Sequence, residues 1–141
     1  MALTPGFIID TSALARLHDP TIRAVLTPMI DLRLVATTQA LDAEVLYSAR
    51  SAKDYDAIRA RRRTAYISLS IVDRHWEAAF DAQSRLARTG RHRAVGITDL
   101  LTAVVAAEHR ATVVHYDQDF EVAAEVVDFT HRWVAPRGSV A

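Results

Sequence analysis

Acidic side chains at four separate places in the chain are the residues best suited to bind a metal ion. They are Asp10 in FIIDTSAL, Glu44 in LDAEVLYSAR, Asp99 in ITDLLTAVV, and Asp117 with Asp119 in HYDQDF. Carboxylate oxygens are the ligands that hard divalent cations such as Mg²⁺ and Mn²⁺ prefer. If the fold brings these acids together, their repulsion requires a counter-charge of this kind.

The alternation of apolar and amphipathic segments predicts the elements that position these acids. Strands are expected at residues 7–10, 32–37 and 111–117, with a strand or extended connection at 66–71 and a possible edge strand at 129–134. Helices are expected between them, at residues 12–17, 20–31, 39–50, 52–65, 74–88, 99–109 and 119–127. This order implies crossover connections, so the sequence predicts an α/β fold with three layers. Its mostly parallel sheet of four to five strands would lie between helices.

Polar residues are expected to mark the ends of the helices. The expected N-caps are Thr37 or Thr38, Ser51, Asp73, Thr98 and Asp119. Pro28 falls inside the segment 20–31, where its missing N–H is expected to kink or divide the helix. Gly90 is expected to end the helix that precedes it.

The predicted strands bring the acids to one edge of the sheet, where ligands bind in open parallel sheets. Asp10 and Asp117 follow the first and third confident strands, and Asp99 lies in the first turn of an apolar helix. Each acid also has a plain structural interpretation. Asp10 could cap the next helix, and Asp99 could favour the dipole of its own helix. Asp117 and Asp119 could be turn and cap residues.

Glu44 competes with a second acid on the same predicted helix, Asp42. The two differ by two positions and therefore point to different helix faces. Glu44 shares its face with Leu41 and Tyr47, so we expect Glu44 to point inward. Alone, it could equally be a solvated helix residue.

Length and composition limit the classes of protein. The 141 residues, 50% hydrophobic and 24% charged, fit a single globular domain over residues 1–141. No apolar run reaches the roughly 18 residues of a membrane span, and the N-terminus lacks a signal-peptide pattern, so a cytoplasmic protein is expected. The absence of cysteine excludes disulfides and thiolate zinc sites. Zero net charge argues against a tight charge-driven nucleic-acid binder, but not against an enzyme that contacts a few phosphates.

Four motifs, in order and spacing, resemble those of PIN-domain nucleases, and most closely the VapC-type toxins of bacterial toxin–antitoxin pairs. The motifs are FIIDTSAL, LDAEVLYSAR, ITDLLTAVVAAEH and HYDQDFE. The resemblance implies a Mg²⁺- or Mn²⁺-dependent endoribonuclease that hydrolyses RNA with a metal-activated water. The acids that match the family are Asp10, Glu44, Asp99 and Asp117, with Asp119 adjoining; we place Asp117 first because it is expected to end the strand directly.

The resemblance also implies supporting residues and partners. Ser12 matches a hydroxyl residue that helps to order the site, and Thr98 adjoins Asp99. Arg91 and Arg93 could clamp a phosphate, or could belong to a solvated loop. The implied partners are an RNA substrate, a VapB-type antitoxin and a second copy of the chain, with no membrane.

Two other enzyme classes fail on particular residues. A haloacid-dehalogenase-type phosphatase requires a second Asp where this chain has Ser12, and a receiver domain requires a late lysine, whereas the only lysine is Lys53. A PIN-like module that binds RNA or protein without cutting remains an alternative.

Overall fold

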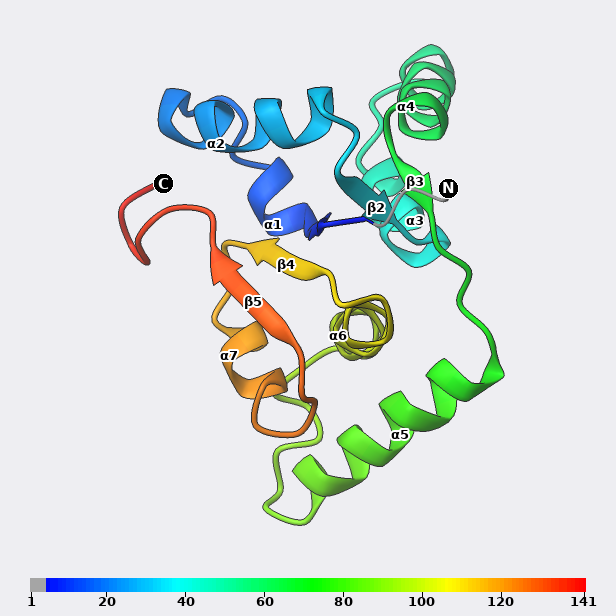
Figure 1. The fold of residues 1–141 in the computed structure, drawn as a ribbon, viewed down its shortest axis with the longest axis vertical. Coiled ribbons are helices and arrows are strands. Elements are labelled where there is room, and N and C mark those ends of the chain that lie inside the picture. The colour runs from blue at the N-terminus through cyan, green and yellow to red at the C-terminus, as the bar shows by residue number, and fades with distance from the viewer. Residues whose placement is uncertain (1–4) are drawn as a thin grey trace.

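The computed structural model describes residues 5–141, which form one parallel sheet with helices on both faces (Figure 1). The strands are β1 (Phe7–Ile9), β2 (Val35–Thr37), β3 (Ile67–Ser68), β4 (Thr112–His115) and β5 (Thr130–Trp133). Their order across the sheet is β3-β2-β1-β4-β5, and every neighbouring pair is parallel. The predicted α/β fold with three layers is confirmed, and the expected edge strand near residue 130 is β5.

Seven helices connect and cover these strands in the described part of the chain. They are α1 (Thr11–Leu14), α2 (Pro20–Asp31), α3 (Gln39–Tyr47), α4 (Ala52–Ala65), α5 (Asp73–Ala87), α6 (Ile97–His109) and α7 (Asp119–Ala123). Figure 1 shows α1 and α2 on one face of the sheet and α6 and α7 on the other, with α5 packed outside α6. The helices α3 and α4 lie at the end of the sheet formed by β2 and β3.

The central strands are buried because their apolar side chains face helices on both sides. Ile8 and Val113 pack with residues of α6 in one cluster. Ile9 and Val114 pack with α1 and α2 in another cluster on the opposite face. Successive strand residues point to opposite faces, so the continuous apolar runs FII and TVV serve both layers at once.

Several predicted helix ends are correct. Helix α2 begins at Pro20 as expected, Thr38 accepts the Leu41 N–H at 3.3 Å, and Ser51 accepts the Asp54 N–H at 3.0 Å. Gly90 has a φ of 73°, as expected for a residue that ends a helix in the left-handed region.

Other expectations about the helices are wrong. Pro28 does not divide α2, which continues to Asp31; Pro28 lies on the exposed face, where water can satisfy the carbonyl left without its N–H. Asp73 is the first residue of α5 and follows the cap position of Val72. Of the segment 66–71, expected as a strand or an extended connection, only Ile67–Ser68 is a strand, and the first helix is only Thr11–Leu14.

Among residues 5–141, no helix is both long enough and apolar enough to cross a membrane.

Candidate metal centre

Asp10 lies at the carboxyl end of β1 and uses its two carboxylate oxygens differently. Its Oδ2 accepts the Ser12 N–H at 3.0 Å and the Ser12 hydroxyl at 2.6 Å, so Asp10 is the N-cap of α1. Its Oδ1 is buried and has no hydrogen-bond partner within residues 5–141. The whole residue is only 3% exposed. A buried anionic oxygen without a partner is costly, and a bound cation would satisfy it.

Ser12 connects Asp10 to the neighbouring strand. While its hydroxyl donates to Asp10, the same oxygen accepts the N–H of Tyr116 at 2.9 Å, just past the end of β4. Arg16 donates to the Ser12 carbonyl at 2.7 Å and lies 4.3 Å over the Tyr116 ring. These contacts hold the ends of β1 and β4 together, which fits the ordering function that the resemblance implies for Ser12.

Three further acids converge beside Asp10. One carboxylate oxygen each from Asp99, Asp117 and Asp119 lies within 4.8 Å of the other two. Asp99 is the third residue of α6, whereas Asp117 and Asp119 come from the segment between β4 and α7. The elements predicted to carry the acids therefore do bring them to one edge of the sheet.

The positions of Asp117 and Asp119 differ from the sequence-based expectation. The strand β4 ends at His115, so Asp117 does not end it directly. Asp119 is the first residue of α7 and not its N-cap. The cap position is Gln118, whose side chain makes no cap hydrogen bond. Asp117 precedes it, and its Oδ1 accepts the Asp119 N–H at 2.9 Å. The side chain that satisfies an N–H at the start of α7 is therefore that of Asp117 and not that of Asp119, and both residues remain within the acidic cluster.

His115 holds the backbone of the segment between β4 and α7. Its Nδ1 accepts the Asp117 N–H at 3.2 Å, so the ring proton is on Nε2, which donates to Nδ1 of His131 at 2.8 Å. His115 is fully buried and its ring stacks on Phe120. Burial, and next the neighbouring His131, lower the pKa of His115 to about 4, so the ring is neutral.

Glu44 and Asp42 point to different surroundings, as their spacing predicts. Glu44 accepts a hydrogen bond from the Thr11 hydroxyl at 3.0 Å, which places it beside the N-terminal turn of α1. Asp42 instead pairs with Arg62 at 2.7 Å. The choice of Glu44 is consistent with this geometry, but one reason for it is wrong, because Tyr47 is 94% exposed and does not mark an inward face.

Burial, together with the charges of neighbouring acids, raises the pKa values of Asp10, Asp99 and Asp119. Burial first, and then the charges of Asp10, Asp117, Glu44 and Asp119 in that order, raise the pKa of Asp99 to about 8. Burial also raises the pKa of Asp10, against the hydrogen bonds from Ser12 that lower it. Acids that resist ionisation in this way require a counter-charge, and a divalent cation supplies it.

The remaining predicted residues lie nearby or elsewhere. Thr98 is the second residue of α6, whose N-cap is Gly96, so the expected capping function of Thr98 is wrong; it borders a shallow hollow together with Glu44. Arg91, which could clamp a phosphate or belong to a solvated loop, pairs with Glu125 at 2.9 Å. Arg93 is exposed in the loop before α6.

Sequence reasoning did not identify two contributors. The first is Thr11, whose hydroxyl donates a hydrogen bond to Glu44. The second is His115, and no signal in the sequence indicates that its ring holds the Asp117 backbone.

Comparison with known proteins identifies the family of this chain. Residues 7–126 match the PIN domain family. The chain is 36% identical to Ribonuclease VapC21 of Mycobacterium tuberculosis over 97% of its length and 99% of that protein. It is 33% identical to Ribonuclease VapC51 of the same organism, over 95% of this chain and 96% of that one. The chain belongs to the PIN domain family, and its curated relatives are VapC ribonucleases.

Solved structures share the fold. VapBC2 from Rickettsia felis, bound to a DNA fragment from its promoter, gives a TM-score of 0.71 at 14% identity, over 90% of this chain and 97% of that chain. VapBC-5 from Mycobacterium tuberculosis gives a TM-score of 0.58 at 23% identity, over 92% of this chain and 98% of that chain. The predicted PIN-like architecture is confirmed.

Proposed function

We propose that the chain is a metal-dependent endoribonuclease and acts as the toxin of a toxin–antitoxin pair. Its relatives over almost the whole length are named ribonucleases, and solved structures that share its fold include VapBC proteins. The observation that carries the proposal is the convergence of acids from β1, α3, α6 and the β4–α7 segment on one edge of the sheet. A PIN-like module without activity would not need to keep so many like charges together.

The donor set fits Mg²⁺ or Mn²⁺. It consists of carboxylate oxygens only, including the partnerless Oδ1 of Asp10 and the three oxygens of Asp99, Asp117 and Asp119. Hard divalent cations bind such sets, whereas softer metals favour nitrogen and sulfur. When bound, such an ion lowers the pKa of a coordinated water and neutralises charge on a phosphoryl oxygen.

The chain's own residues prepare the site for this chemistry. Ser12 fixes Asp10 through Oδ2 and leaves Oδ1 facing the cluster, while Thr11 orients Glu44 toward the same place. In the absence of a cation, Asp99 holds a proton at neutral pH because its pKa is raised to about 8. Cation binding therefore releases this proton, and the affinity for the metal increases as the pH rises toward 8.

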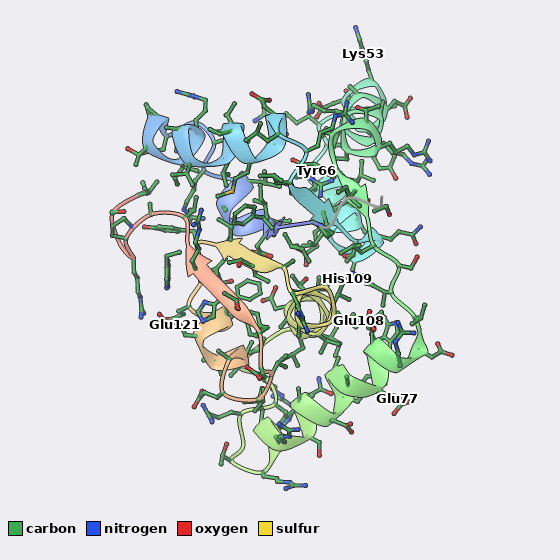
Figure 2. The ribbon with its side chains drawn as sticks, in the orientation of Figure 1. Lys53, Tyr66, Glu77, Glu108, His109 and Glu121 are labelled. Atoms are coloured by element: carbon green, nitrogen blue, oxygen red, sulfur yellow. The ribbon has the colours of Figure 1, made fainter. Side chains whose placement is uncertain are left out.

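Cleavage of RNA by purified protein tests the proposal. We expect cleavage with Mg²⁺ or Mn²⁺ and none with excess chelator. Glu44→Gln should abolish cleavage, whereas Glu77→Gln on the surface of α5 (labelled in Figure 2) is a matched control and should cleave normally. Cleavage that persists in chelator would refute the metal mechanism. RNA binding without cleavage under any metal would favour the non-catalytic alternative.

The partners follow from the same proposal. We expect a VapB-type antitoxin that covers the acidic edge, an RNA substrate, and a homodimer of the nuclease chain in the cytoplasm. Co-expression with the adjacent reading frame and sedimentation of the purified chain test the antitoxin and the dimer.

A further inference from the structure

A polar hollow, separate from the acidic cluster, lies on the face of α3 that carries Asp42. It has a volume of about 480 Å³. We call it the basic pocket, and its charged and aromatic walls are Arg59, Arg62, Arg63, Tyr55, Tyr66 and Asp42. Thr37 and Ser68, which end β2 and β3, also line it, so the basic pocket opens at the same edge of the sheet as the acidic cluster.

The sequence of α4 explains why the pocket is basic on one side. Tyr55, Arg59 and Arg63 are spaced four residues apart, so they lie along one face of the helix. Arg61 belongs to the same basic run but points to another face and does not line the pocket. The N-terminal end of α4 points away from the body of the protein, as Lys53 does in Figure 2.

One of the three arginines builds the wall of the pocket. The buried Arg62 donates from Nε to Asp42 Oδ1 at 2.7 Å and from Nη2 to Thr37 Oγ1 at 2.9 Å. Its guanidinium lies 4.7 Å over the ring of Tyr66. Because Asp42 is neutralised by Arg62, the exposed Arg59 and Arg63 leave the pocket with a net positive charge. Such a pocket attracts an anion.

The shallow hollow that Thr98 and Glu44 border lies next to the basic pocket. Ala43 lines both hollows, and the shallow one is also bordered by Glu44, Tyr47 and Thr98. Thr98 is next to Asp99 in the chain, and Glu44 is one of the proposed catalytic acids. A chain molecule lying across α3 could therefore contact the acidic cluster and the basic pocket together.

We propose that the basic pocket binds a phosphate of single-stranded RNA to one side of the bond that is cut. Arg59 and Arg63 would contact the phosphate, and the half-exposed Tyr55 would stack on a base beside it. This rests on the proposed ribonuclease function for the identity of the strand. An acidic peptide could use the charges, whereas a nucleotide combines a phosphate for the two arginines with a base that stacks on the tyrosine ring, so RNA fits the pocket better.

Binding of a fluorescein-labelled, single-stranded RNA of about 12 nucleotides, measured by anisotropy in excess chelator, tests the proposal apart from cleavage. The double variant Arg59→Gln/Arg63→Gln should bind at least tenfold more weakly at low salt. The slope of log affinity against log salt should fall by about 1.4, since each phosphate contact to a single strand contributes about 0.7. Tyr55→Ala should weaken binding with an unchanged slope, because stacking carries no charge.

Arg61→Gln is the control, since it removes one arginine charge from another face of the same helix. Equal RNA affinity and salt slope for the double variant and this control would overturn the proposal. Binding of polyglutamate that depends on Arg59 and Arg63, without such dependence for RNA, would also overturn it and identify an acidic protein partner. Loss of a dimer in the double variant with unchanged RNA binding would assign the pocket to a second copy instead.

The two proposals fail in different ways. If the wild-type chain binds RNA with the expected dependence but cleaves none with any metal, the pocket stands and the ribonuclease function fails. If the wild-type chain cleaves RNA and the double variant matches Arg61→Gln, only the pocket assignment fails.

Discussion

Removing the charge of Asp99 should stabilise the protein in the absence of metal. Asp99 has the most crowded carboxylate of the site, because the charges of Asp10, Asp117 and Glu44 all oppose its ionisation and burial removes water from it. In Asp99→Asn the side chain keeps its shape but can no longer carry a charge. The variant therefore removes the repulsion without opening a cavity.

The magnitude follows from the difference in pKa between the folded and unfolded chain. A carboxyl that titrates at 3.8 when unfolded and at about 8 when folded favours the folded state fully below pH 3.8. This contribution is lost as the pH rises to 8, because the unfolded chain ionises first. Each unit of pKa difference corresponds to about 1.4 kcal/mol, so the loss of stability is roughly 6 kcal/mol if the charges are held rigidly. The neighbouring acids can turn toward water, which reduces the loss to about 2–3 kcal/mol.

Thermal unfolding in chelator at pH 5 and pH 8.5 measures this effect. For a chain of this size, about 2–3 kcal/mol corresponds to roughly 8–12 °C, so Asp99→Asn should melt that much higher than the wild type at pH 8.5. At pH 5 the advantage should be smaller, since the wild-type Asp99 is then protonated. With saturating Mn²⁺ the order should reverse, because an amide binds a hard cation poorly.

The exposed Asp81 on α5 provides the control. Asp81→Asn removes the same charge at a place far from the cluster. The difference between its melting temperatures at pH 5 and pH 8.5 should be the same as in the wild type. If Asp99→Asn behaves like this control in chelator, the acids do not repel one another as strongly as their geometry indicates, and the reason for expecting a cation is lost.

Two further variants test how the β4–α7 segment is built. Asp117→Ala should weaken Mn²⁺ binding and also cost about 1 kcal/mol of stability in chelator, since the Asp117 side chain accepts the N–H of the first residue of α7. Asp119→Ala should weaken Mn²⁺ binding alone. The opposite pattern in melting curves would contradict the structure. His115→Phe should weaken Mn²⁺ affinity about tenfold by releasing the Asp117 backbone, and His115→Asn should restore it because the amide oxygen replaces Nδ1 as acceptor. Equal Mn²⁺ affinities for the two His115 variants would show that His115 only packs.

The fold was predictable because its strands are strong local signals. The runs that become β1, β2 and β4 are apolar on both faces, and only a strand buried between two layers of helices requires that pattern. The edge positions were harder to predict. The segment that contains β3 alternates over six residues, yet only Ile67–Ser68 pairs with β2, because pairing depends on a neighbour that the local sequence does not specify.

The exact use of polar residues was the least predictable part. Thr98, Asp73 and Asp119 are all good capping residues, but each lies one or two positions after the N-cap of its helix. Local sequence does not distinguish these positions, because Ser, Thr and Asp are also acceptable in the first turn. Asp42 and Glu44 differ in function because they have different partners, Arg62 and Thr11 respectively. Both partners are distant in the chain and meet the acids only in the folded state.

Asp10 shows why capping and metal binding are not alternatives at the end of β1. A helix cap requires one acceptor, and Ser, Thr or Asn would supply it. Asp10 meets this requirement with Oδ2 alone, through the two hydrogen bonds from Ser12. The second oxygen then adds nothing to the cap and leaves a buried acceptor without a partner, which destabilises the chain. An aspartate at this position is therefore better explained by a ligand that needs both a fixed orientation, which the cap provides, and a negative charge.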